Sequence, residues 1–204
     1  MMIEMNVKYD FTFTAASLRL QEMILVAKAL NDKREIDYTN ELGSGKASTG
    51  KRIFSELRKR VAQLTEEELD ILINGSLTAQ KQISLIAVCK SHPFIGDFVI
   101  EVLRDKLLIF DYHVSEGEFL SYYRRKNEMH PEMDSLTEMT QKKIKQVTFK
   151  ILEQVGLIDS IKNKCIQPQI IDSSLLNAVI NDNPNWLKFL LISDTDIKNS
   201  IDLV

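Results

Sequence analysis

The sequence predicts an all-α protein, because apolar residues recur with helical spacing in nearly every segment and few residues favour turns. The 204 residues include 7 glycines and 4 prolines, which favours helices over a turn-rich β fold. Hydrophobic residues make up 44% of the chain, an ordinary fraction for a globular protein, and this length can bury a sizeable core. We therefore expect a multi-helix globular protein.

The first part of the chain predicts three helices. Residues 14–30 are apolar nearly all round, which indicates one buried helix at the centre of the fold. A polar connection containing glycine leads to a second helix, with Ser48 or Thr49 as its N-cap. The apolar stripe of this helix consists of Ile53, Phe54, Leu57, Val61 and Leu64. Thr65, followed three residues later by Glu68, predicts a capping box at the start of the third helix.

Two strongly apolar segments follow, at residues 79–89 and 94–110, and we expect both to pack centrally. Pro93 lies between them and suits the first position of a helix. The second segment carries charges whose spacing predicts ion pairs within one helix: Asp97, Glu101, Arg104 and Asp105.

A shorter helix is expected around residues 119–126, before the break at Pro131. The connection over residues 127–139 is longer than the ~3–4 residues of a tight helix-turn-helix, which leaves room for a further short helix. The sequence therefore predicts a helix around residues 119–126, a connection, and a second helix that begins near residue 140.

Residues 140–158 predict one helix with two different faces. The aliphatic face consists of Ile144, Val147, Ile151, Leu152 and Val155. The opposite face consists of Lys142, Lys143, Gln146 and Lys150. Cationic and amide side chains in one row can reach phosphates and base edges in a DNA groove roughly 12 Å wide. The alternative is that these lysines only solvate a surface helix. Gly156 suits the left-handed residue that ends such a helix.

The C-terminal segment predicts a last helical pair at residues 173–180 and 185–192, broken at Pro184, with Trp186 as a core anchor. Between residues 158 and 171 the pattern leaves two alternatives open, a loop and a small β-hairpin of the kind that forms the wing of a winged helix. We expect two domains, over residues 1–113 and 114–204.

Charge distribution is more informative than the net charge of −3. Residues 46–60 contain six basic side chains against Glu56 alone, whereas acidic residues gather elsewhere, and such a basic segment can attract phosphate locally. The candidate DNA-binding residues are Lys46, Ser48, Thr49, Lys51, Arg52, Ser55, Lys59, Arg124, Arg125, Lys126, Gln141, Lys142, Lys143, Gln146 and Lys150.

No catalytic, metal or cofactor site is expected. Residues 45–52 match the spacing of a phosphate-binding loop, but Arg52 stands where magnesium needs a hydroxyl and the preceding segment is polar, unlike a buried strand. The three histidines are scattered, and Cys89 and Cys165 lack the spacing of a zinc site or a disulfide framework. No apolar run reaches the ~18–20 residues of a membrane span, so we expect a soluble cytoplasmic protein that does not bind membranes.

Four segments together resemble the BrxA family, the small α-helical component of bacteriophage exclusion (BREX) systems. They are YDFTFTAASLRLQEMILVAKAL, TGKRIFSELRKRVAQLTEEELDILING, DFVIEVLRDKLLIFDYHVSEGEFLSYYRRK and TQKKIKQVTFKILEQVGLI. The resemblance implies two helix-turn-helix-like units, binding of double-stranded DNA, other defence subunits as partners and no catalytic activity. By position, it places the DNA-binding surfaces on Lys51, Arg52 and Ser55 and on Gln141, Lys142, Lys143, Gln146 and Lys150.

Two functional hypotheses remain from the sequence. One is a DNA-binding accessory protein of a phage-defence complex, monomeric in isolation. The other is an interaction scaffold whose basic helices meet acidic surfaces of other subunits, with incidental binding of nucleic acid.

Overall fold

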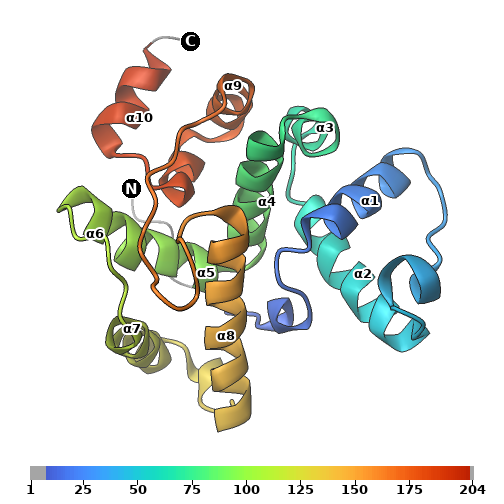
Figure 1. The fold of residues 1–204 in the computed structure, drawn as a ribbon, viewed down its shortest axis with the longest axis horizontal. Coiled ribbons are helices and arrows are strands. Elements are labelled where there is room, and N and C mark those ends of the chain that lie inside the picture. The colour runs from blue at the N-terminus through green and yellow to red at the C-terminus, as the bar shows by residue number, and fades with distance from the viewer. Residues whose placement is uncertain (1–7, 203–204) are drawn as a thin grey trace.

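The computed structural model describes residues 8–202, and its elements are helices arranged around α4 (Figure 1). The helices are η1 (Thr12–Ala15), α1 (Leu20–Asn31), η2 (Tyr38–Leu42), α2 (Ala47–Val61), α3 (Glu66–Asn74), α4 (Leu77–Ser91), α5 (Pro93–Phe98), η3 (Val99–Arg104), α6 (Asp105–Leu108), α7 (Glu116–Met129), η4 (Pro131–Met133), α8 (Glu138–Val155), α9 (Ser173–Asp182), η5 (Pro184–Leu190) and α10 (Asp194–Ile201). The prediction of an all-α fold is confirmed.

The hydrophobic core runs through both halves of the chain. Helix α4 packs against α2 and α3 on one side and against α8, α9 and η5 on the other. Aromatic side chains join α5, α7 and α8, since the Phe98 ring lies 5.2 Å from Phe119 and 5.9 Å from Phe149 between centroids. The segments on either side of residue 113 thus share one cluster of buried side chains.

The long N-terminal helix expected over residues 14–30 is wrong in its first turn and a half. Residues 12–15 form the 3₁₀ helix η1, and α1 begins only at Leu20. Between them the chain is held open by Arg60 of α2, which donates to the carbonyl oxygens of Ala16 and Ser17, both at 2.7 Å. Carbonyls that accept from a distant guanidinium are not available to a regular helix.

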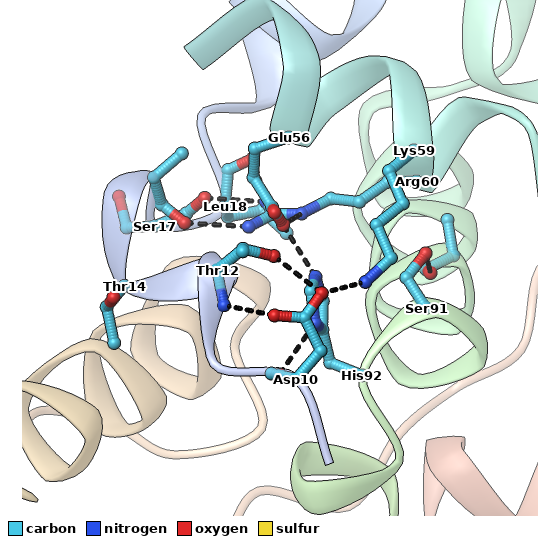
Figure 2. A network of polar contacts seen from close by, with 12 residues as sticks. Asp10, Thr12, Thr14, Ser17, Leu18, Glu56, Lys59, Arg60, Ser91 and His92 are labelled. Atoms are coloured by element: carbon cyan, nitrogen blue, oxygen red, sulfur yellow. Dashed lines mark hydrogen bonds and ion pairs between the residues drawn. The ribbon is translucent and has the colours of Figure 1, made fainter. Parts of the chain in front are cut away.

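A buried charged cluster surrounds that guanidinium (Figure 2). Arg60 is fully buried and its Nε donates to Glu56 Oε1 at 2.8 Å. Nε2 of the buried His92, at the corner between α4 and α5, lies 2.6 Å from the same oxygen. Arg60 is one of the six basic residues that the sequence analysis counted in the segment 46–60, and its burial removes it from the charge available to attract phosphate. This cluster ties η1 and its flanks to α2 and to the α4–α5 corner.

Helix α2 begins earlier than expected. Its N-cap is Lys46 rather than Ser48 or Thr49, which lie exposed in its first turn. Inside the helix, Gly50 is buried against η2, and a Cβ atom there would come within 1.7 Å of the Tyr38 carbonyl oxygen. The missing side chain at position 50 therefore lets η2 pack directly on α2.

The later elements follow the sequence more closely. Thr137 caps α8 by accepting from the Thr140 amide, and Gly156 ends it with φ 91°. The short helix expected in the connection is η4. In the segment that was left open between loop and hairpin, the described residues form two isolated bridges, His113–Cys165 and Ile158–Ile166, rather than a β-hairpin. The final 3₁₀ helix is followed by α10, which the sequence analysis missed.

We predict that Arg60→Met lowers the free energy of unfolding by about 3–5 kcal/mol, because it leaves the Glu56 carboxylate buried without its main partner. Lys51→Met, on the exposed face of the same helix, is the matched control and should change it by less than ~0.5 kcal/mol. Urea unfolding curves measure both. Equal stabilities for the two variants would mean that the cluster does not hold the fold.

A second prediction concerns acid. Burial would raise the pKa of Glu56, but the hydrogen bond with His92 and the charge of Arg60 outweigh it and lower the pKa from 4.5 to about 2. A lowered pKa means that the carboxylate stabilises the fold fully above pH ~4.5 and that this contribution is lost as the pH falls towards ~2. Unfolding free energy measured from pH ~5 to ~3 should fall less steeply in Glu56→Gln than in the native protein. The neutral neighbour change Ser55→Ala should keep the native slope, and a native slope in Glu56→Gln would contradict the assignment.

Candidate nucleic-acid interface

Helix α2 presents the first group of candidate residues on its exposed face. Ile53 and Leu57 are buried on the core side, as the stripe predicted. Lys51, Arg52 and Ser55 are exposed on the other side. Lys46, Ser48 and Thr49 are exposed at the start of the helix, so this end carries basic and hydroxyl side chains together.

Helix α8 presents the second group in the same manner. Ile144 and Ile151 are fully buried, whereas Lys142, Lys143 and Gln146 are exposed. The Lys143 ammonium donates to the Gln146 side chain at 3.3 Å, which aligns the two along the helix. Gln141 is half-buried because its amide nitrogen donates to the Leu136 carbonyl at 3.1 Å, so it is partly occupied within the protein.

The structure brings the two helices to adjoining hollows on either side of η1, which contacts both of them. The first hollow, about 1320 Å³, lies along α2, and the second, about 570 Å³, lies along the start of α8. Thr14 lines both. We call the two hollows together the α2–α8 groove. Its basic and amide lining residues are Lys8, Arg52, Arg58, Lys59, Lys142, Lys143 and Gln146.

The carboxylates of the α2–α8 groove are occupied by partners within the protein. Asp10 accepts from the Lys59 ammonium at 2.5 Å, and Glu132 accepts from the Tyr9 amide at 2.6 Å. Burial tends to raise the pKa of both carboxyl groups, but these hydrogen bonds outweigh it and lower each pKa. Glu56 is held by Arg60 and His92 as described above. Asp10 and Glu56 are thus each paired with a cation, whereas Glu132 is hydrogen-bonded to a neutral amide.

Several cations of the groove, in contrast, are free to bind an anion. Within residues 8–202, Arg52, Arg58 and Lys143 have no carboxylate partner. The Arg58 guanidinium lies 5.9 Å from the centroid of the Phe54 ring, which fixes its position without neutralising it. The Lys142 ammonium is as far as 4.0 Å from the Glu138 carboxylate, and both side chains are largely exposed, so this ion pair is weak. Six basic side chains line the groove against three carboxylates, which gives it a positive face.

Other candidate residues lie outside the groove. Lys126 is buried in α7, with its ammonium 2.7 Å from both Asp97 and Glu101. Arg125 also pairs with Glu101, at 2.7 Å. Arg124 is exposed on the same helix but does not line the groove. The ion pairs expected within the 94–110 helix are therefore wrong, because Asp97 and Glu101 pair with α7 instead.

Two further candidates are engaged by nearby carboxylates. Lys150 lies on the exposed face of α8, but pairs with Glu153 at 2.6 Å and does not line the groove. Lys59 lines it while paired with Asp10. The candidate set missed two basic residues that line the groove, Lys8 and Arg58. The spacing of Arg58 from Arg52 and Ser55 on α2 follows the same exposed face and could have identified it.

The structure also shows the segment that matches the spacing of a phosphate-binding loop, the His, Cys, Asp and Glu side chains, and the apolar helices. Residues 47–52, the end of the sequence resembling a phosphate-binding loop, are helical and follow the π-helical turn η2 rather than a strand. Among the described side chains, no group of three His, Cys, Asp or Glu could hold a metal ion. Taken one at a time, the described helices are too short or too polar to span a membrane; α4 and the 93–108 segment meet that criterion only as a pair bent by 114°.

Comparison with known proteins identifies the family. The BrxA family model matches residues 7–183, which is most of the chain. The chain belongs to the BrxA family. Relatives described as BREX protein BrxA include one from Paramagnetospirillum magneticum, 22% identical over 88% of this chain and 94% of its own length. Another, from Bacillus cereus, is 24% identical over 84% of this chain and 90% of its own length.

A solved structure extends the comparison to the fold. The crystal structure of an uncharacterized protein from Magnetospirillum magneticum is similar with a TM-score of 0.78 at 21% identity. The similarity covers 91% of this chain and 98% of that one. The helical arrangement described above is thus shared with an experimentally determined structure.

The burial of Lys126 yields a prediction that separates a structural lysine from a surface cation. Lys126→Met should lower the unfolding free energy by about 2 kcal/mol, because it leaves two carboxylates without their shared ammonium where α7 packs on α5 and η3; their partial exposure limits the loss. Arg124→Met, two residues earlier and exposed, should change it by less than ~0.5 kcal/mol. Chemical denaturation measures both, and similar losses in the two variants would contradict this assignment.

Proposed function

We propose that this BrxA protein is a non-catalytic accessory subunit of a BREX phage-defence system that binds double-stranded DNA through the α2–α8 groove. Membership of the BrxA family supports the accessory role in defence and implies other defence subunits as partners. The observation that carries the DNA part is that both basic helices line hollows that adjoin at Thr14. In this proposal the protein is a monomer in isolation.

The chemistry of the groove suits a phosphate backbone. Guanidinium groups such as those of Arg52 and Arg58 can bind phosphate oxygens through two hydrogen bonds, and ammonium groups such as that of Lys143 act as point charges. Contacts from two helices on either side of η1 would fix the orientation of a duplex, since backbone contacts position a protein on DNA. In this proposal η2–α2 and α7–η4–α8 act as the two helix-turn-helix-like units.

The proposal predicts that both sides of the groove contribute to binding. Arg52→Glu on α2 and Lys143→Glu on α8 should each weaken binding to random-sequence duplex about tenfold or more, since charge reversal removes attraction and adds repulsion. The slope of log affinity against log salt, about −0.9 per phosphate neutralised, should flatten by about one unit for each lost contact. Fluorescence anisotropy titrations at several salt concentrations measure both quantities.

The matched control reverses two exposed lysines outside the groove, Lys162 and Lys198, and should bind DNA like the native protein. Loss of affinity in only one of the groove variants would restrict binding to that helix and contradict a duplex that spans both hollows. Native affinity in both, with native melting temperatures, would favour the alternative of an interaction scaffold.

A further inference from the structure

The end of α6 carries the largest exposed apolar side chains that follow one another in the described chain. Ile109 is 73% exposed and Phe110 is 78% exposed, and Leu108 and Tyr112 beside them are also exposed. We call these four residues the α6 tip. In Figure 1, α6 lies at one end of the long axis of the molecule, and α1 and α2 lie at the other. The α6 tip is thus well separated from the α2 side of the α2–α8 groove.

The backbone at Phe110 is one that a phenylalanine rarely adopts. Its φ of 62° lies in the left-handed region, which favours glycine. The Phe110 amide donates to the Leu107 carbonyl and the Asp111 amide donates to the Lys106 carbonyl, at 3.0 and 2.9 Å. These two bonds form the motif that usually ends a helix with glycine. Since the side chain is mostly exposed, packing within this chain does not explain why a bulky residue occupies this position.

The surroundings of the α6 tip are acidic. Lys106 is the basic group at its base, and it is held by both Asp111 and Glu118. Asp105 is exposed and has no ion-pair partner among the described residues. Beside the tip, Leu108 and Ile109 also line a hollow of about 570 Å³ that reaches Tyr122 of α7. This hollow also holds Glu101 and Arg125, which pair with each other at 2.7 Å. The carboxylates of Asp105, Asp111 and Glu118 therefore still outnumber the Lys106 ammonium. A protruding apolar tip next to a hollow is suited to interlocking with another surface.

We propose that the α6 tip docks into an apolar pocket, rimmed by basic side chains, on another subunit of the defence system. The proposal rests on the accessory role above for the source of the partner, but not on DNA binding. Strained residues at exposed positions are typical of functional contacts, and exposed clusters of large apolar residues mark interaction surfaces. The acidic surround selects a basic rim through charge complementarity.

The same charges disfavour a second copy of this chain as the occupant. In a symmetric dimer formed tip to tip, the acidic surrounds of the two tips, with Asp105 and Asp111, would lie against each other, because a two-fold contact brings identical surfaces together. Like charges placed opposite one another oppose association. We therefore assign the α6 tip to a partner of different charge.

The test is to co-express the native chain with each other subunit of its BREX system and to measure the affinity of any complex by titration. Phe110→Gly and Ile109→Asp should each weaken the complex at least tenfold. Phe110→Gly should also melt at the native temperature or up to about 3 °C higher, because glycine relaxes the left-handed backbone. Ile170→Asp, at an isoleucine 88% exposed outside the tip, is the matched control and should bind like the native chain.

Several outcomes would overturn the proposal. These are the absence of a complex with any subunit, native affinity in both tip variants, a fall of several degrees in the melting temperature of Phe110→Gly, and a dimer of the native chain in light scattering that Ile109→Asp dissociates. DNA binding is measured on the same variants. Tip variants that lose the partner but bind duplex like the native protein would support docking through the α6 tip. This conclusion holds even if the groove variants show that DNA does not bind in the α2–α8 groove.

Discussion

The buried guanidinium of Arg60 is the interaction on which the surrounding architecture depends. It binds Glu56 on its own helix and the carbonyls of Ala16 and Ser17 more than forty residues away, and Glu56 in turn binds His92. A charge buried so fully is tolerated only when each of its donors has an acceptor. The carbonyls it occupies lie between η1 and α1, and α1 begins only at Leu20. Because η1 carries Thr14, the residue common to both hollows, the shape of the α2–α8 groove follows from this buried cluster.

Features that depend on residues close together in the sequence, such as helix caps and apolar stripes, could be predicted from the sequence. Thr65 and Glu68 cap α3 as the capping box predicted, and the aliphatic stripe of α8 is buried as its period indicated. The start of α1 could not be predicted, because it is set by Arg60, whose acceptors lie elsewhere in the chain. Helical periodicity marks the apolar stripe of α2 but does not show that a charged residue such as Arg60 is buried, because its partners are distant in the sequence.

The candidate site residues differ in the same way: some positions follow from the local helix, and others depend on partners distant in the sequence. Helical phase was enough to place Lys51, Arg52, Lys142 and Lys143 on exposed faces. It was not enough for Lys126, which belongs to a basic cluster in the sequence but lies between Asp97 and Glu101 in the fold. Those carboxylates have a spacing that suits pairs within their own helix, and only the packing of α7 on α5 and η3 shows otherwise. A count of basic residues therefore overestimates the positive surface, and the ion pairs determine which cations remain to bind an anion.

Ion pairing also explains how an acidic protein can present a positive groove. Its net charge of −3 is a sum over the whole chain, whereas the field inside a hollow is dominated by the nearest uncompensated groups. In the α2–α8 groove some cations have no carboxylate partner among residues 8–202, while around the α6 tip carboxylates outnumber cations. Two surfaces of opposite character thus lie in different parts of one helical fold with a shared core. Under the proposed function, this separation would allow a duplex and a partner subunit to be held at the same time, because neither has to displace the other.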